Sequence, residues 1–156
     1  MPRRSVRENK TVYQLSRERA GFTREAAAER LGFMTPARIE KIESERSAPH
    51  PEEVLAMAEA YADPLLRNAY CTQECPIGRK YVPRAEEKSL SQITLEMVVT
   101  LNELMRDRDR LMEITVDGAV TEDEERDFRS IRDNLERMSG AIESLKLWLD
   151  GAQRND

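Results

Sequence analysis

The sequence is short of the residues on which most enzyme and metal sites depend. Its 156 residues include one histidine, two cysteines and six glycines. There is no glycine-rich phosphate loop, no His-Glu-x-x-His motif and no nucleophile elbow. Two cysteines are also too few for the multi-bridge framework of a small secreted domain. We therefore expect no catalytic residues, no enzyme activity and no cofactor.

Long apolar runs are absent from the sequence as well. The longest, Val54 to Ala58, is far shorter than the roughly 20 residues that span a bilayer, and the N-terminus has no apolar signal core. We expect a cytoplasmic protein with no membrane partner. Aromatic residues make up only 5% of the chain, whereas good helix formers such as Ala, Leu, Glu and Arg are abundant. At this length, the composition predicts one or two small all-α domains.

The net charge of −5 conceals an uneven distribution. Residues 1–50 carry 11 Lys and Arg against 7 acidic residues, a net charge of +4, whereas residues 89–156 carry 9 against 16, a net charge of −7. Only the N-terminal part is therefore suited to meet phosphate groups. Arg3, Arg4 and Arg7 extend this basic part, either as an arm that contacts DNA or as a frayed terminus.

The first 65 residues carry the start and stop signals of four short helices. Thr23 is placed to cap one of them, and Gly21 and Gly32 stand where helices end. Thr35 followed by Pro36 starts another, because proline at the first helical position loses no hydrogen bond. Their short lengths and apolar spacing predict a compact bundle. The expected helices cover residues 6–20, 24–31, 36–44 and 51–61.

Residues 20–32, AGFTREAAAERLG, together with residues 39–43, IEKIE, resemble the helix-turn-helix of the Cro/CI-like (XRE) family of phage and bacterial repressors. Residues 51–61, PEEVLAMAEAY, are similar to the next helix of that family. The resemblance covers roughly residues 10–65. It implies a lambda-repressor-like helix-turn-helix bundle over residues 1–68, and a transcriptional regulator whose partner is double-stranded DNA.

The resemblance also implies roles for individual residues. Arg24 matches a phosphate contact at the start of the second helix, and Arg17 with Glu43 matches a buried structural ion pair. Positions on the third helix match those that face base edges. Helix-start amides and basic side chains are suited to hold phosphates. The candidate DNA-binding residues are Thr23, Arg24, Thr35, Pro36, Ala37, Arg38, Lys41 and Arg46.

The start of the third expected helix, which would face the DNA bases, has few side chains that can form hydrogen bonds, and this is compatible with a second function. Pro36 offers no side-chain hydrogen bond and Ala37 reaches only a thymine methyl, so that Lys41, with Arg38, is left to read bases. Glu45 adds negative charge near the groove. The alternative is a protein-interaction module whose helix-turn-helix fold no longer binds DNA strongly. In that case the charged side chains of the third helix are ordinary solvated surface.

Residues 63–88 are expected to form a docked turn or short helix followed by a connector, and the connector between the two domains is placed at residues 69–88. They contain Cys71 and Cys75, which are spaced by one helical turn and supply only two ligands, whereas zinc takes four. His50 is the sole histidine. We therefore expect no metal site, and we interpret both cysteines as small apolar residues in a packed turn.

Residues 89–150 have the pattern of a long antiparallel helical hairpin. Ser89 with Gln92 and Thr121 with Glu124 are capping boxes that open two helices, and Asp117-Gly118 separates them. Apolar residues recur at coiled-coil spacing along both helices. This pattern predicts two long helices that pack side by side.

The apolar stripe on the first hairpin helix is wider than one partner helix can cover. The simplest second partner is another copy of the hairpin, which would form a four-helix bundle across a two-fold axis. The alternative is a hairpin that packs against its own N-terminal bundle. The expected homodimer contacts are Val98, Met105, Met112, Leu135, Ile142 and Leu149.

Overall fold

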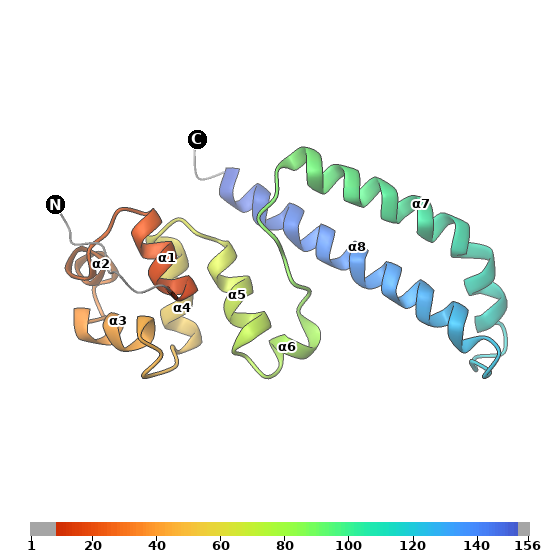
Figure 1. The fold of residues 1–156 in the computed structure, drawn as a ribbon, viewed down its shortest axis with the longest axis horizontal. Coiled ribbons are helices and arrows are strands. Elements are labelled where there is room, and N and C mark those ends of the chain that lie inside the picture. The colour runs from red at the N-terminus through yellow and green to blue at the C-terminus, as the bar shows by residue number, and fades with distance from the viewer. Residues whose placement is uncertain (1–8, 153–156) are drawn as a thin grey trace. The chain divides into compact units, whose positions relative to one another are not determined.

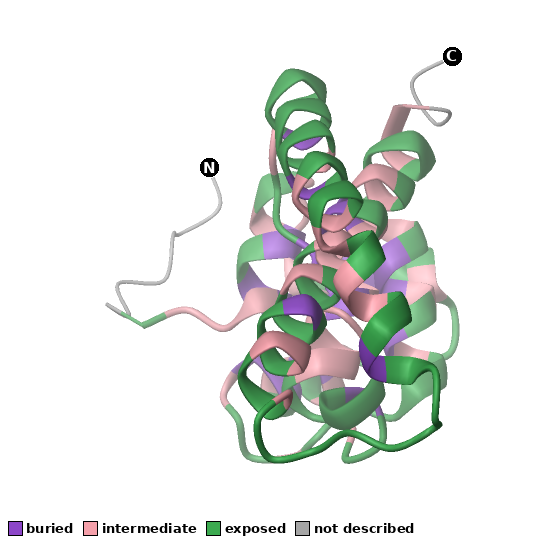
Figure 2. Cartoon of the chain, turned by 90° about the vertical axis from the view of Figure 1, so that its right-hand side faces the viewer, coloured by how far each residue is buried: buried purple, intermediate pink, exposed green. Residues whose placement is uncertain are grey.

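The computed structural model describes residues 9–152, and all regular elements in that range are helices (Figure 1). These residues form two compact units, one comprising residues 9–82 and 150–152 and the other residues 83–149. Buried residues gather between helices, and exposed residues cover their outer sides (Figure 2). The all-α fold that the composition predicts is confirmed.

Six helices form the N-terminal unit, and local chemistry fixes where most of them begin. Thr11, Thr23 and Thr35 each accept a backbone hydrogen bond from the first turn of the helix that follows. Proline occupies the first helical position of α3 and α4. The helices are α1 (Val12–Arg19), α2 (Arg24–Leu31), α3 (Pro36–Glu43), α4 (Pro51–Ala60), α5 (Leu65–Gln73) and α6 (Gly78–Tyr81).

The first helix is shorter than its sequence pattern predicts. It begins at Val12 and not at Val6, because Thr11 has an extended backbone and caps it. The N-terminal arginines at positions 3, 4 and 7 lie outside the described residues. The other three expected helices agree with α2, α3 and α4 to within one residue at each end.

The expected boundary after residue 68 is displaced to residue 82 because α5 and α6 pack on the N-terminal bundle. Leu66 of α5 is a buried member of its core, and Tyr70 packs against that core. Gly78 brings α6 against the backbone of α5, since a Cβ at this position would lie 2.2 Å from the carbonyl oxygen of Cys71. Residues 69–82 therefore belong to the N-terminal unit.

The second unit is an antiparallel hairpin of α7 (Leu90–Thr115) and α8 (Glu125–Ala152), whose part up to Leu149 belongs to this unit. The capping box of Ser89 and Gln92 opens α7. Thr121 donates to the Glu124 carboxylate from its backbone nitrogen at 3.0 Å and from its hydroxyl at 2.8 Å. However, residues 122–124 form a turn, and α8 begins at Glu125. The second helix therefore starts later than its sequence pattern predicts.

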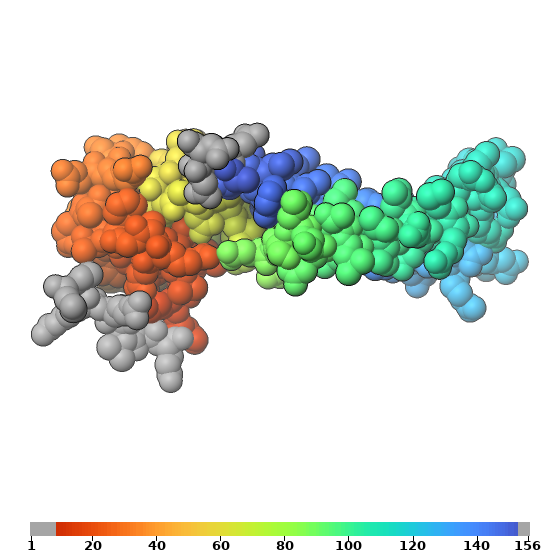
Figure 3. All heavy atoms as spheres, turned by 90° about the horizontal axis from the view of Figure 1, so that it is seen from above, coloured from red at the N-terminus to blue at the C-terminus, as the bar shows by residue number. Residues whose placement is uncertain are grey.

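Three polar contacts cross between the hairpin helices. They join Arg110 to Asp127 at 2.7 Å, Asp107 to Asn134 at 3.0 Å and Glu103 to Arg137 at 2.8 Å. Residue numbers fall along α7 as they rise along α8, which requires an antiparallel pair. In the space-filling view, side chains of α7 and α8 meet along the hairpin (Figure 3). The buried residues of the two helices are Ile93, Thr100, Ile114, Ile131, Ala141 and Ser144.

Candidate nucleic-acid interface

The turn between α2 and α3 shapes the candidate interface. Gly32 ends α2 with a φ of 76°, a left-handed conformation that favours glycine. Thr23 and Thr35 then cap α2 and α3, their hydroxyls accepting from Ala26 N at 3.1 Å and from Arg38 N at 3.2 Å. Each of the two helices therefore begins with a satisfied cap and carries the partial positive charge of a helix N-terminus.

A buried carboxylate joins α1, α2 and the end of α3. Glu43 accepts from Arg17 Nε at 2.5 Å and Nη2 at 3.0 Å, and from Arg24 Nε at 2.8 Å. Burial lowers the pKa of Arg17, but the hydrogen bond and charge of Glu43 outweigh that effect and raise it. The structure thus contains the ion pair that the resemblance implies. It also adds Arg24 to that pair, which the sequence did not indicate.

Arg38 lies in a position that the sequence did not indicate. Its Nε and Nη2 donate to the two carboxylate oxygens of Glu53 at 2.7 and 2.6 Å, and its Nη1 donates to Ser47 Oγ at 2.6 Å. These bonds brace α3 against the start of α4. The Arg38 guanidinium would have to break these bonds before it could contact a base.

The remaining cations of the interface differ in whether their side chains are already paired within the domain. Arg46 pairs with Glu40 and also donates to Ser44 Oγ at 2.9 Å. Lys41 is exposed on α3, and its side chain has no ion pair or hydrogen bond within residues 9–152. Lys41 is therefore the cation of α3 that is available to a ligand without breaking a bond inside the domain.

An aromatic side chain stands beside the start of α3. Phe33 is 61% exposed, whereas the next residue, Met34, is 5% exposed and belongs to the core. Thr35 and Ala37 are exposed, and Pro36 is half-buried. Phe33 was not among the candidate site residues that the sequence predicted.

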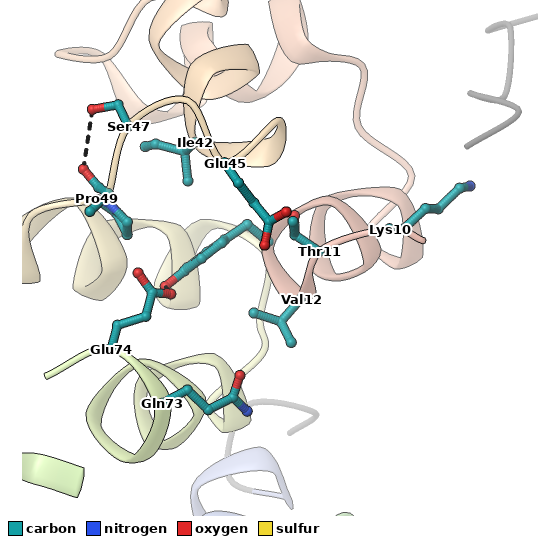
Figure 4. Close-up of a pocket in the computed structure, with 11 residues that line it drawn as sticks. Lys10, Thr11, Val12, Ile42, Glu45, Ser47, Pro49, Gln73 and Glu74 are labelled. Carbon is teal, nitrogen blue, oxygen red and sulfur yellow. Dashed lines mark hydrogen bonds between the residues drawn. The ribbon is translucent and has the colours of Figure 1, made fainter. Parts of the chain in front are cut away.

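A polar hollow of about 550 Å³ lies between the start of α1, the loop after α3 and the end of α5 (Figure 4). Its lining includes Lys10, Glu45 and Glu74. Tyr13 donates a hydrogen bond to the Glu74 carboxylate, and burial followed by this bond raises the pKa of Tyr13 well above its usual value. The hollow brings together none of the candidate DNA-binding residues.

Cys71 lies in α5 and Cys75 follows that helix, and Cys75 has a local structural partner. Cys75 Sγ accepts from the backbone nitrogen of Gly78 at 3.4 Å, and both Cys71 and Cys75 are half-buried. Between residues 9 and 152, no group of three or more His, Cys, Asp or Glu side chains is placed to hold a metal ion.

The hairpin unit exposes an apolar face that includes all six expected dimer contacts. Met105 is 65% exposed and Leu135 is 46% exposed. The cross-helix bonds between residues 103 and 137 and between residues 107 and 134 place Met105 and Leu135 at the same height along the hairpin. One heptad away, Val98 and Ile142 also lie at the same height. When two antiparallel helices pack together, residues that are rotated in the same direction away from the contact between the helices lie on the same side of the hairpin. The hairpin face comprises Val98, Met105, Met112, Leu135, Ile142 and Leu149.

Comparison with known proteins agrees with this geometry. Residues 14–66 match the family model of a helix-turn-helix domain. The match runs from α1 to the start of α5, and the Cro/CI-like resemblance is consistent with it. No curated protein and no solved structure matches the chain. Among the described helices, none is long and apolar enough to cross a membrane. Residues 14–66 of this all-helical chain therefore form a helix-turn-helix domain.

Proposed function

We propose that the chain is a sequence-specific transcriptional regulator that binds double-stranded DNA as a homodimer. The observation that carries the DNA part is the match of residues 14–66 to a helix-turn-helix domain, together with the exposed start of α3. In such domains the second helix of the motif enters the major groove, which is about 12 Å wide. A cytoplasmic location and the absence of enzyme activity are part of the proposal.

In this proposal, the two helix starts and two cations contact the DNA. The first-turn amides of α2 and α3, beside Thr23 and Thr35, donate to phosphate oxygens. Arg24 is 35% exposed in its side chain and contacts a phosphate while Arg17 keeps Glu43 paired. Lys41 reaches a base edge or a phosphate from the exposed side of α3. The buried pair of Arg17 and Glu43 holds the geometry of these groups.

The hairpin face supports the dimer part of the proposal. Contiguous exposed apolar patches above a few hundred Å² are rare on monomers and mark interaction sites. The seven-residue spacing of this face on both helices suits a second identical hairpin, so that the two copies form a four-helix bundle. A dimer presents two α3 helices to half-sites about 34 Å apart, one turn of DNA.

One observation favours a second function, a protein-interaction module that has kept the helix-turn-helix fold. Three of the candidate DNA-binding arginines pair with carboxylates of their own domain, Arg24 with Glu43, Arg38 with Glu53 and Arg46 with Glu40. Phosphate binding by these arginines would have to compete with those ion pairs. The net charge of −7 over residues 89–156 also disfavours contact between the hairpin and DNA.

A titration with labelled random-sequence duplex at two salt concentrations separates the two functions, provided that the mass of the same sample is measured by light scattering. The DNA-binding function predicts a dimer whose affinity falls steeply as salt rises, because each phosphate contact releases a counterion. A folded dimer that binds no duplex at either salt concentration would overturn the DNA part and leave the protein-interaction module.

A further inference from the structure

The start of α3 is apolar where a reading helix usually carries polar groups. Thr35 uses its hydroxyl to cap the helix, Pro36 has no side-chain donor, and Ala37 ends in a methyl group. Arg38, the next residue, is held by Glu53 and Ser47. No unpaired long side chain before Lys41 is therefore available at this end of α3 to form hydrogen bonds with bases.

Phe33 is a further exposed apolar side chain, two residues before the cap of α3. Burial alternates along the segment before α3, because Phe33 is exposed, Met34 is buried and Thr35 is exposed. Met34 precedes the cap and, together with the buried Ile39, occupies the two positions of a hydrophobic staple. Met34 therefore supplies the anchoring contact, and the Phe33 ring lies on the solvent side together with Thr35.

Nothing in the core requires a phenyl ring at this position. The turn is already fixed by the left-handed Gly32 and by the Thr35 cap. Phe33 has no ring pair or cation contact within residues 9–152. The exposed ring leaves apolar surface in water. A ligand that covers the ring would therefore gain hydrophobic free energy on binding.

Apolar side chains recognise one feature of the major groove. The C5-methyl group of thymine is the apolar group that a base pair presents there, and Ala, Thr and Phe side chains contact it. The residues that begin a reading helix are those that meet base edges. Phe33, Thr35 and Ala37 together present a ring and two methyl groups at that end of α3.

We propose that the start of α3 recognises thymine methyl groups, with Phe33 as the main specificity-determining residue and Ala37 beside it. This inference rests on the proposed DNA binding and specifies its chemistry. The protein selects half-sites with thymine at the positions that face Phe33 and Ala37, and hydrogen bonding from Lys41 contributes further along the helix.

The test begins with the full chain and a random-sequence duplex pool. Duplexes that the wild-type protein selects are then synthesised in two forms, one with thymine and one with uracil, which differs only by the lost methyl group. Binding of both forms is measured at one salt concentration for the wild type, for Phe33→Ala and for Ile77→Ala. Ile77 is a matched control, because it is 71% exposed at the start of α6, away from α3 (Figure 1).

We expect the wild type to bind the uracil form about fourfold more weakly for each methyl group it buries, which corresponds to about 0.8 kcal/mol per buried CH₂. Phe33→Ala should bind the thymine form several-fold more weakly and should lose most of the discrimination, while Ile77→Ala keeps the wild-type ratio. Equal binding of both forms by the wild type, or full discrimination by Phe33→Ala, would overturn the inference while DNA binding stands. A wild type that selects no duplex would overturn the proposed function itself, and this inference with it.

Discussion

Arg38 and Glu53 form a two-pronged ion pair between α3 and the residue that completes the cap of α4. The two N–O distances are 2.7 and 2.6 Å, and the Glu53 carboxylate also accepts from His50 N at 2.7 Å. Glu53 thus helps to cap α4 and also holds the side chain of Arg38, which the sequence predicted to bind DNA. This pair determines which groups of α3 remain free for a ligand.

The Arg38–Glu53 pair predicts an acid-dependent loss of stability. The hydrogen bond from Arg38 is the main cause of the lowered pKa of Glu53 in the folded protein. The unfolded chain therefore binds this proton more readily, with a pKa of about 4.3. The pair contributes its stability above that pH and loses it as pH falls through the lower folded pKa. Chemical unfolding from pH 6 to pH 3 should show a smaller acid-induced loss in Arg38→Ala than in the wild type, and equal losses would contradict the assignment.

Removing the buried carboxylate of Glu43 should severely destabilise the N-terminal unit. Glu43→Ala leaves the Arg17 guanidinium buried without its partner, and breaking one side of a buried pair costs about 3–5 kcal/mol of unfolding free energy. Glu40→Ala is the matched control, because it removes a partly exposed carboxylate from the same helix and should cost at most about 1 kcal/mol. Urea unfolding of both variants measures the difference, and similar losses would argue against a structural role for Glu43.

Replacing Glu45 by glycine should stabilise the same unit. Glu45 has a φ of 60°, a left-handed conformation that is unfavourable for a residue with a Cβ. Glu45→Gly removes this strain and should raise the free energy of unfolding by about 1 kcal/mol. Ala48→Gly in the same loop has no left-handed strain to relieve and should not stabilise. A thermal melt that shows no gain for Glu45→Gly would contradict this explanation.

The hairpin face predicts which substitutions abolish the dimer. Met105→Lys places a charge on that face, whereas Val99→Lys changes an exposed residue of α7 that is not three, four or seven positions from any member of the face. Light scattering should give the mass of a monomer for Met105→Lys and the mass of a dimer for Val99→Lys. A wild-type protein that is monomeric at micromolar concentration would contradict the dimer directly.

Local chemistry explains why much of the fold could be predicted from the sequence. Thr23 and Thr35 cap their helices through bonds to residues three positions away, and such bonds are readable from the sequence alone. The heptad spacing in residues 89–149 likewise identified an apolar face that the structure leaves exposed. The start of the first helix was not predicted correctly. The apolar pattern begins at Val6, but Thr11 caps the helix and α1 begins at Val12.

The contacts that the sequence did not indicate at the candidate site join residues that are distant in the sequence. Arg38 appeared free because Glu53 lies 15 residues away and meets it only once α4 has packed. Arg24 appeared to be a simple phosphate contact, but it shares the buried carboxylate of Glu43. The exposed ring of Phe33 could not be foreseen, because two apolar residues follow Gly32 and the sequence does not say which one enters the core. Tertiary packing decided all three positions.

The most direct test of the account compares the salt dependence of DNA binding for the wild type and for the double variant Arg24→Ala/Lys41→Ala. The control is Arg79→Ala/Lys80→Ala, which removes two exposed cations from α6. Because each phosphate contact contributes about 0.9 to the slope of log K against log salt, the first variant should flatten the slope by about one to two units. The control should leave the slope unchanged. Equal slopes for all three proteins, or no binding by a folded wild-type dimer, would contradict the claim that this helix-turn-helix domain binds DNA through α2 and α3.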